Sequence, residues 1–368
     1  MKKNAEKVSV VECKDYDEER VEKAIAECFE LIGFEPKENS KVMLKPNVVG
    51  AYGKNQEAIT THLSVIRGVC EFLKKRNCEI MVGDSSFIDT GKFMKQLGIE
   101  ELANKYGKCV VFDKEDLVEV KDDNSAFVHS LKIPKVLQEV DYIINLPKLK
   151  THVLTLYSGA LKNMYGCVPG SMKQTYHNKA RGYENFSKLC VDLYQKVIPH
   201  MNLMDGIIGM EGPGATAGYP KNSGLLMASK NAIALDIASS KIIGFDPKEI
   251  VMIDESIKRG LYDSWDFELI GMEKLPEIKF QKPHEEEIKK GLGIVFPERD
   301  VLVNKEKCMK CNICASRCPV DAIIMNPYPT IDYKKCIRCF CCAEVCPYHA
   351  MDVEKKESVL QKTLSSEK

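Results

Sequence analysis

Two cysteine runs near the end of the 368-residue chain restrict its fold more than any other feature. Both have the spacing C-x2-C-x2-C-x3-C and both are followed by proline. The first run is Cys308, Cys311, Cys314 and Cys318, and the second is Cys336, Cys339, Cys342 and Cys346. Three thiolates at three-residue intervals on a tight loop can cover one face of a cubic iron-sulfur cluster, and the fourth ligand must come from a distance. The segment therefore predicts a metal-binding module of two related halves.

This spacing resembles that of bacterial ferredoxins, in which the last cysteine of each run binds the cluster of the other run. The resemblance implies two 4Fe-4S clusters as cofactors. It implies one cluster held by Cys308, Cys311, Cys314 and Cys346, and a second held by Cys336, Cys339, Cys342 and Cys318.

Zinc and disulfide bonds are the alternatives for these cysteines. Zinc sites usually use two pairs of ligands with a longer gap, and disulfides are typical of secreted proteins. The spacing favours clusters over both. The other eight cysteines form no C-x-x-C pair among themselves, so we expect most of them to be small buried hydrophobic side chains. Cys341 lies inside the second run but outside its register, and we expect it not to be a ligand.

The charge balance disfavours two classes of partner. Lys and Arg total 53, and so do Asp and Glu, so no bulk charge favours nucleic acid or an anionic membrane. No apolar stretch is long enough to span a bilayer, and no signal peptide is visible after Met1. We therefore expect a cytoplasmic protein.

Short apolar runs alternate with amphipathic stretches over the first 270 or so residues, which is typical of an α/β domain. We expect a mostly parallel sheet flanked by helices over residues 1–275. A proline-punctuated linker at 276–297 would lead into a small α+β domain of the bacterial ferredoxin type at 298–353, and 354–368 would be a flexible tail.

Hydrophobic periodicity places the elements of the large domain. Strands are expected at Lys7 to Glu12, Lys41 to Leu44, Glu79 to Val82, Val110 to Phe112, Asp141 to Leu146, Asn202 to Met204 and Leu225 to Ala228. Helices are expected at Asp17 to Leu31, Leu63 to Lys75 with Thr61 as a cap, Thr90 to Leu97, Asn185 to Val197, Ala232 to Ile243 and Pro247 to Arg259.

Four of these strands run into polar residues that the fold does not need. They continue into Lys45-Pro46-Asn47, Gly83-Asp84-Ser85, the segment from Pro147 to His152, and Asp205-Gly206. Because the carboxyl ends of parallel strands meet at one edge of a sheet, we expect a ligand site there.

The segment from Lys148 to His152 is the main candidate for that site. If it is extended, Lys148, Lys150 and His152 share one side and could bind a carboxylate or phosphate. The following segment from Leu156, which includes Lys162, is expected to begin as a helix whose first N–H groups could bind the same anion. The alternative is that these lysines are ordinary solvated loop residues.

Two further features carry weaker predictions. His62 lies at the start of a helix, where it could be an acid/base group, a ligand or simply a cap. The stretch from Gly209 to Gly218 misses the dinucleotide-binding pattern by one residue, so we expect a mobile loop over the strand ends. Asp205 and Glu211 border this loop and could act as acid, base or cation ligands, or serve structural hydrogen bonds.

Several of these motifs together resemble the family known as domain of unknown function 362. They are KPN at Lys45, TTH at Thr60, GDSS at Gly83, NLPKLKTH at Asn145, SGALKNMYG at Ser158, DGIIGMEGPG at Asp205 and ALD at Ala234. The resemblance covers about residues 5 to 270, and members are often fused to a two-cluster ferredoxin module. It implies an architecture and brings no catalytic residues.

Three functions remain open from the sequence. The first is an oxidoreductase that delivers electrons from the clusters to an anionic small molecule, with Lys148, Lys150, Lys162, His152 and His62 as candidate catalytic residues. The second is a non-enzymatic electron carrier or adaptor that docks a redox protein partner through its lysines. The third is a ligand-binding or cofactor-maturation module. Lysines in a concave, water-restricted pocket would favour the first function, and lysines on a convex surface would favour the second.

Overall fold

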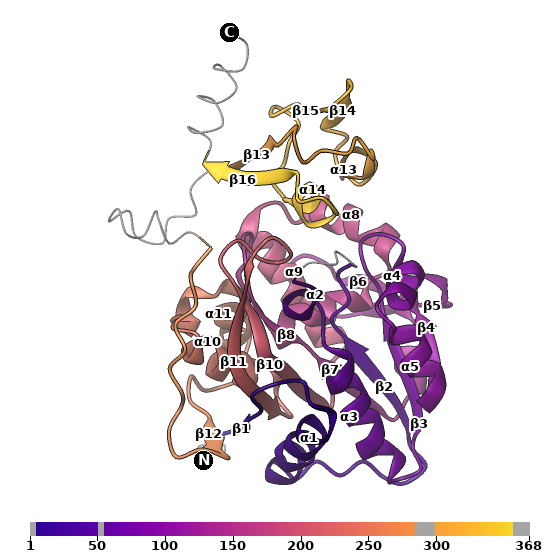
Figure 1. The fold of residues 1–368 in the computed structure, drawn as a ribbon, viewed down its shortest axis with the longest axis vertical. Helices are drawn as coiled ribbons and strands as arrows, with labels where there is room; N and C mark the ends of the chain where they lie inside the picture. Colours follow the sequence, from indigo (N-terminus) through magenta and orange to yellow (C-terminus); the bar gives the residue numbers. More distant parts are fainter. Residues whose placement is uncertain (1–4, 51–54, 284–298, 356–368) are drawn as a thin grey trace.

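The computed structural model describes residues 5–50, 55–283 and 299–355. They form a large α/β domain and a small domain that carries the cysteine runs (Figure 1). The small domain lies over helix α8 (Gly170–Lys179) at one end of the large domain. The first part of the expected linker packs against the large domain. The backbone N–H groups of Ile278 and Phe280 donate to carbonyl groups at the end of α10 (Ala232–Ile242). The rest of that linker and nearly all of the expected tail lie outside the described residues.

The main sheet has the order β12-β1-β11-β10-β7-β2-β3-β4, with β8 paired to β10 and β9 paired to β8. Its strands are β1 (Lys7–Glu12), β2 (Lys41–Pro46), β3 (Glu79–Asp84), β4 (Gly107–Val111), β7 (Tyr142–Leu146), β8 (Lys148–His152), β9 (Leu156–Ser158), β10 (Met201–Glu211), β11 (Tyr219–Ser229) and β12 (Glu268–Ile270). Neighbours are parallel from β10 through β7, β2 and β3 to β4, whereas β11 is antiparallel to β1 and β10. The predicted mostly parallel α/β fold is confirmed.

Helices cover both faces of this sheet. The helices described in the large domain are α1 (Glu18–Ile32), α2 (Gln56–Ile59), α3 (Leu63–Lys74), α4 (Thr90–Gln96), α5 (Ile99–Tyr106), α6 (Val136–Glu139), α7 (Ala160–Asn163), α8, α9 (Gly182–Lys196), α10 (Ala232–Ile242) and α11 (Val251–Lys258). A separate hairpin joins β5 (Leu117–Lys121) to β6 (Ser130–Pro134). The central strands β2, β3 and β7 contain continuous apolar runs because both faces are buried. In β2, Val42 and Leu44 pack into one core, and Met43 packs into the other.

Four local predictions are wrong in whole or in part. The stretch expected to be a loop from Gly209 begins as strand, because Gly209 to Glu211 are the last residues of β10; only 212–218 form the loop of the β10–β11 hairpin, and its Ala215 lines a pocket at the strand ends as expected. The segment at Leu156 begins as strand β9, because it pairs with β8, and becomes helical only at Ala160. The helix expected at Pro247 is broken at Ile250 into a 3-10 turn and α11. The cap of α3 is His62 instead of Thr61, since its Nδ1 accepts the Ser64 N–H.

The two halves of the small domain have the same backbone conformation around their cysteine runs. Strand β13 (Arg299–Val303) pairs with β16 (Met351–Lys355), β14 (Ile323–Met325) pairs with β15 (Pro329–Ile331), and the short helices are α13 (Ile313–Ser316) and α14 (Cys341–Glu344). Residues with positive φ recur 28 positions apart, as at Lys310 and Arg338 (56° and 54°) and at Asn312 and Phe340 (64° and 59°). Positive φ is uncommon outside glycine, so its recurrence shows that both runs adopt the same loop.

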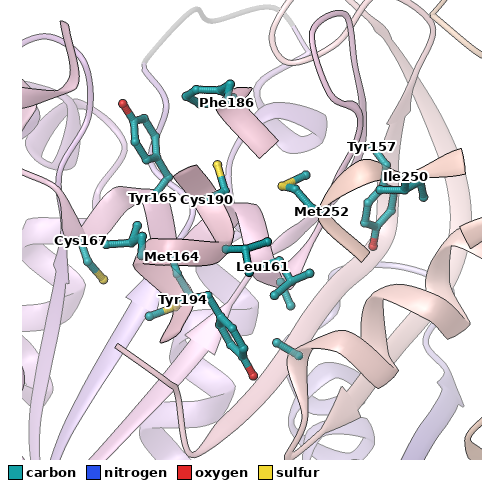
Figure 2. Close-up of a cluster of buried hydrophobic side chains, with 14 of the residues drawn as sticks. Tyr157, Leu161, Met164, Tyr165, Cys167, Phe186, Cys190, Tyr194, Ile250 and Met252 are labelled. Carbon is teal, nitrogen blue, oxygen red and sulfur yellow. The ribbon is translucent and has the colours of Figure 1, made fainter. Parts of the chain in front are cut away.

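The core between α7, α9 and α11 supports the ligand-facing end of the large domain. Figure 2 shows Tyr165 and Phe186 together at one end of this buried cluster, with Cys190 beside them. All three side chains are buried. This packing fixes the position of α8 and α9, which carry part of the site described next.

Candidate functional site

Each cysteine cavity is lined by three cysteines of one run and the last cysteine of the other. The cysteines of the first cavity are Cys308, Cys311, Cys314 and Cys346. The cysteines of the second are Cys336, Cys339, Cys342 and Cys318. Among the described residues, no three or more Cys, His, Asp or Glu side chains are close enough together to bind a single metal ion. Four thiol groups around a cavity fit a polynuclear cluster better than a lone ion such as zinc.

The last cysteine of each run is held in the same way. Cys318 Sγ accepts the backbone N–H of Ala322 at 3.2 Å, and Cys346 Sγ accepts that of Ala350 at 3.3 Å. Hydrogen bonds to sulfur favour the thiolate form and tune the potential of a bound cluster. Cys341 is buried and lines neither cavity.

A pocket lies between the strand ends and the small domain, and we call it the lysine pocket. It collects polar side chains from β2, from the segment after β3, and from β8, α7 and α8. Its charged or titratable lining groups are Lys45, Asp84, Lys150, Lys162, Lys173, His177 and Glu344. The expected ligand site at the strand ends is therefore a concavity, and the small domain forms one of its walls.

The four lysines of this pocket differ in their partners. Lys45 forms a buried ion pair with Asp84, with 2.6 Å between Nζ and Oδ1. Lys150 donates only to neutral oxygens, at 2.6 Å to Asn47 Oδ1 and 2.9 Å to the Ile59 carbonyl. Lys173 donates to the Ser85 hydroxyl at 3.1 Å and to the Ser85 carbonyl. In the described part of the chain, Lys150, Lys162 and Lys173 take part in no ion pair.

Burial disfavours the charged form of these amino groups. It lowers the pKa of Lys150 well below its usual value, and the nearby ammonium of Lys162 adds to this effect. Burial likewise lowers the pKa of Lys173 to about 8. An anion in the pocket would stabilise the charged form of both lysines, so the site is suited to binding a negatively charged molecule.

Glu344, on α14 of the small domain, contacts the large domain at His152. Its Oε1 lies 3.1 Å from His152 Nε2. His152 Nδ1 accepts two backbone N–H groups, from Leu154 at 3.0 Å and Thr155 at 3.3 Å, so the ring proton is on Nε2, facing Glu344. Burial lowers the pKa of His152 to about 4, so its imidazole is neutral at pH 7. His152 thus joins the two domains and does not itself line the lysine pocket.

The Lys148 ammonium is turned away from the lysine pocket. Its Nζ lies 2.8 Å from Asp205 Oδ2 and 2.6 Å from the Tyr16 hydroxyl, and both charged side chains are fully buried. Asp205 also accepts the Tyr16 hydroxyl and the His62 backbone N–H. This network ties β8 and β10 to the start of α3, so Lys148 and Asp205 form a structural ion pair.

We expect Lys148→Met to lower the free energy of unfolding by about 3–5 kcal/mol, because Asp205 would be left as an unpaired buried charge. The shift of the denaturant midpoint measures this change. Lys221→Met is the control, since the Lys221 side chain is 38% exposed and its Nζ lies 3.8 Å from Glu211 Oε2, and it should cost less than about 1 kcal/mol. Equal losses in the two variants would contradict the structural role of Lys148.

His62 also lies away from the lysine pocket. Its ring stacks on Tyr16 with 3.7 Å between the centroids, and it lines a separate pocket beside α2 and α3. The first N–H groups of α7 are not available to an anion either. Those of Ala160 and Leu161 donate to the Asp236 carboxylate at 2.6 and 2.9 Å. Glu211 accepts the backbone N–H of Gln281 at 2.9 Å and stabilises the hairpin.

Of the predicted residues, the structure brings Lys150 and Lys162 into the pocket, with His152 behind Glu344. Sequence reasoning missed the roles of Lys173 and His177 on α8 and of Glu344 on α14. Lys45 and Asp84 were already visible as polar residues at strand ends. Asn47, whose Oδ1 accepts a hydrogen bond from Lys150, is also one of these polar residues at a strand end.

Comparison with known proteins agrees with this architecture. Residues 301–324 match the 4Fe-4S binding domain family, so the chain is an iron-sulfur protein with a ferredoxin-type domain. Residues 42–241 match the family described as domain of unknown function DUF362, and the chain belongs to that family. The match to the 4Fe-4S binding domain covers the first cysteine run. Within the described residues, no helix has both the length and the apolar character needed to cross a membrane.

One curated relative is a thylakoid-associated protein of Synechocystis sp., 30% identical over 231 residues, which are 61% of this chain and 70% of that protein. A Thermotoga maritima crystal structure aligns with a TM-score of 0.39 at 15% identity, over 60% of this chain and 57% of that one. The lactate racemase apoprotein of Thermoanaerobacterium thermosaccharolyticum aligns with a TM-score of 0.43 at 13% identity, over 67% of this chain and 58% of that one. The alignments thus span less than three fifths of each of these two structures.

Proposed function

We propose that this protein is an oxidoreductase that holds two 4Fe-4S clusters and reduces an anionic small molecule in the lysine pocket. One cluster would be held by Cys308, Cys311, Cys314 and Cys346, and the other by Cys336, Cys339, Cys342 and Cys318. When bound, such clusters supply one-electron transfer. The matched backbone of the two runs and the paired N–H to sulfur bonds support two equivalent sites.

The observation that carries this proposal is the wall shared by the lysine pocket and the cysteine cavities. Glu344 and Val345 line the pocket and lie between Cys342 and Cys346 in the chain. Consecutive Cα atoms are about 3.8 Å apart, so the Cα of Glu344 is within about 8 Å of the Cα of each of these cysteines. A molecule bound in the pocket would therefore lie close to a redox centre.

The concave site favours an enzyme over an adaptor. Lys150 and Lys173 are about 1% and 3% exposed, so a docking protein could not reach their ammonium groups. A small anion could, and Lys150, Lys162 and Lys173 would bind it and offset the negative charge that reduction adds. Lys173, with its pKa lowered by burial to about 8, is also suited to donate a proton at neutral pH.

The reaction balances with one external reductant. An electron-carrying protein or another low-potential one-electron donor gives up two electrons in two steps. The bound substrate takes up these two electrons and two protons from solvent, one of them by way of Lys173. The donor leaves oxidised, and the substrate leaves as the dihydro product.

The test is turnover of the anaerobically purified full chain with reduced ferredoxin, against a panel of carboxylates and phosphate esters. We expect substrate-dependent oxidation of the donor, with formation of a reduced product. Lys173→Gln should abolish most of this activity, and Lys179→Gln should not, because Lys179 is exposed on the same helix. Oxidation of the donor by electron-accepting proteins alone, with no small molecule of the panel reduced, would replace the enzyme with the carrier or adaptor.

We further infer that the redox partner docks at the first cysteine cavity. Cys311 is exposed there, and so are Met309 (65%) and Tyr348 (45%), which also line this cavity. The exposed Lys305, Lys307 and Lys310 belong to the same stretch of chain as Met309 and Cys311, which also contains the exposed Glu306. An apolar patch with a basic rim is complementary to an acidic electron-carrier protein.

Reversing the charge of these lysines should slow electron transfer from an acidic protein partner but not from a small reductant. The pair of substitutions Lys307→Glu and Lys310→Glu should lower the rate of reduction by an acidic ferredoxin about tenfold at low salt. The difference should shrink as ionic strength rises. Reduced methyl viologen, a small cation, serves as the control reductant and should not be slowed. Equal effects on both reductants would contradict a docking surface.

A further inference from the structure

The lysine pocket contains a buried polar group that the binding of an anion by its lysines does not explain. His177, on α8, lines the pocket and is only 3% exposed. Its Nδ1 is buried, and among the described residues it has no hydrogen-bond partner. A buried nitrogen without a partner is destabilising, so such an atom in a pocket wall points to a ligand atom that satisfies it.

The surroundings of His177 are aromatic. Its ring stacks on Phe186, with 4.3 Å between centroids and 16° between planes. The rings of Phe87 and Tyr165 lie 5.5 and 5.7 Å from it. All three of these side chains also line the lysine pocket. The pocket therefore has an aromatic part as well as a basic part.

A ligand that contacts only the basic part of the pocket does not account for the aromatic part. A small inorganic anion would satisfy Lys150, Lys162 and Lys173, but it would leave the aromatic walls in contact with water. Both parts belong to one pocket, so a ligand that reaches the lysines also meets the aromatic rings. Flat side-chain rings favour a flat partner, because stacked or edge-to-face aromatic pairs are stabilised beyond the apolar area that they bury.

We propose that the lysine pocket binds a planar conjugated ring that carries an anionic group and a ring oxygen or nitrogen. The anionic group binds Lys150, Lys162 and Lys173, the ring packs on Phe87, Tyr165 and Phe186, and the ring heteroatom pairs with His177 Nδ1. This inference rests on the proposed function and names its substrate class.

Electron transfer in one-electron steps also favours a substrate with a conjugated ring. Each cluster passes one electron at a time, so the reaction favours an acceptor that can hold a single added electron between the two transfers. A conjugated ring spreads that electron over many atoms, whereas an isolated carbonyl or phosphate group does not. Burial lowers the pKa of His177 to about 3, so the imidazole is neutral at pH 7 and can either donate or accept one hydrogen bond at Nδ1.

The test measures binding of four probes to the cluster-loaded full chain by anaerobic calorimetry. They are 2-naphthoate, 6-hydroxy-2-naphthoate, the saturated decahydro-2-naphthoate and the neutral 2-naphthamide. We expect 2-naphthoate to bind at least about tenfold more tightly than the saturated acid and the amide. The ring hydroxyl should add about a further tenfold.

Two variants assign the hydroxyl effect to His177. His177→Phe keeps a stacking ring and removes Nδ1, so both naphthoates should bind equally to it. His177→Asn places an amide near Nδ1 and should restore part of the difference. If the hydroxyl has the same effect in all three proteins, His177 is not its partner.

The outcomes separate this inference from the proposed function. Equal binding of the saturated and planar acids would overturn the planar-ring class and leave an anion site in place. Binding of the neutral amide alone, or no binding of any acid, would overturn the anion site and the proposed function with it. Circular dichroism of each variant, compared with the unmodified protein, shows whether a loss of binding reflects a loss of fold.

Discussion

Replacing Cys318 and Cys336 together with alanine is expected to leave about four iron atoms per chain, whereas replacing Cys318 and Cys308 together leaves almost none. The reason is that Cys318 lines the same cavity as Cys336, although it belongs to the run of Cys308. The first double variant therefore damages one cluster site and the second damages both. Iron and acid-labile sulfide after anaerobic reconstitution measure the difference.

The reciprocal pair is the matched control. Cys346 with Cys308 should again leave about four irons, because both line the first cavity, and Cys346 with Cys336 should leave almost none. If each run held its own cluster, both results would be reversed. Cys341→Ala should keep all the iron, since Cys341 lines neither cavity.

Replacing Lys150 with glutamine is expected to weaken binding of 2-naphthoate about 30-fold or more. A buried charged partner removed from a hydrogen-bonded pair typically costs about 2–5 kcal/mol. Lys150 donates only to neutral oxygens in the protein, so its ammonium is available to an anion. Lys179→Gln, on the exposed side of α8, is the control and should leave the affinity unchanged.

Binding should also depend on pH in one direction. An anion raises the pKa of the lysines that contact it, so complex formation takes up protons. With the pKa of Lys173 near 8 in the free protein, affinity should be highest below pH 8 and should fall as pH rises above it. Calorimetry in buffers of different ionisation enthalpy measures the proton uptake. Affinity that increases above pH 8 would contradict the role of these lysines.

Much of the architecture could be predicted from local patterns. The three-residue intervals of the cysteines are dictated by a tight loop, and the 28-residue recurrence of positive φ is the structural form of that sequence repeat. Strands β1 and β3 begin where the apolar runs begin, because strands buried on both faces leave a continuous signal. Lys150 was predictable because it follows such a strand.

The remainder of the site depends on contacts between distant segments. Lys148 has the same local pattern as Lys150, and only the packing of β10 shows that Asp205 neutralises it. Helix α8 has almost no apolar stripe, so nothing in its sequence places Lys173 and His177 in a pocket. Glu344 has Ser316 as its counterpart in the first run, so the repeat itself gives no reason to select it.

The claim on which the proposed function depends is that the small domain holds two clusters beside the lysine pocket. The most direct measurement is the iron and acid-labile sulfide content of the unmodified chain after anaerobic reconstitution. We predict about eight of each per chain, with electron paramagnetic resonance of the reduced protein showing two interacting centres. About four of each, or a single iron without sulfide, would contradict the account.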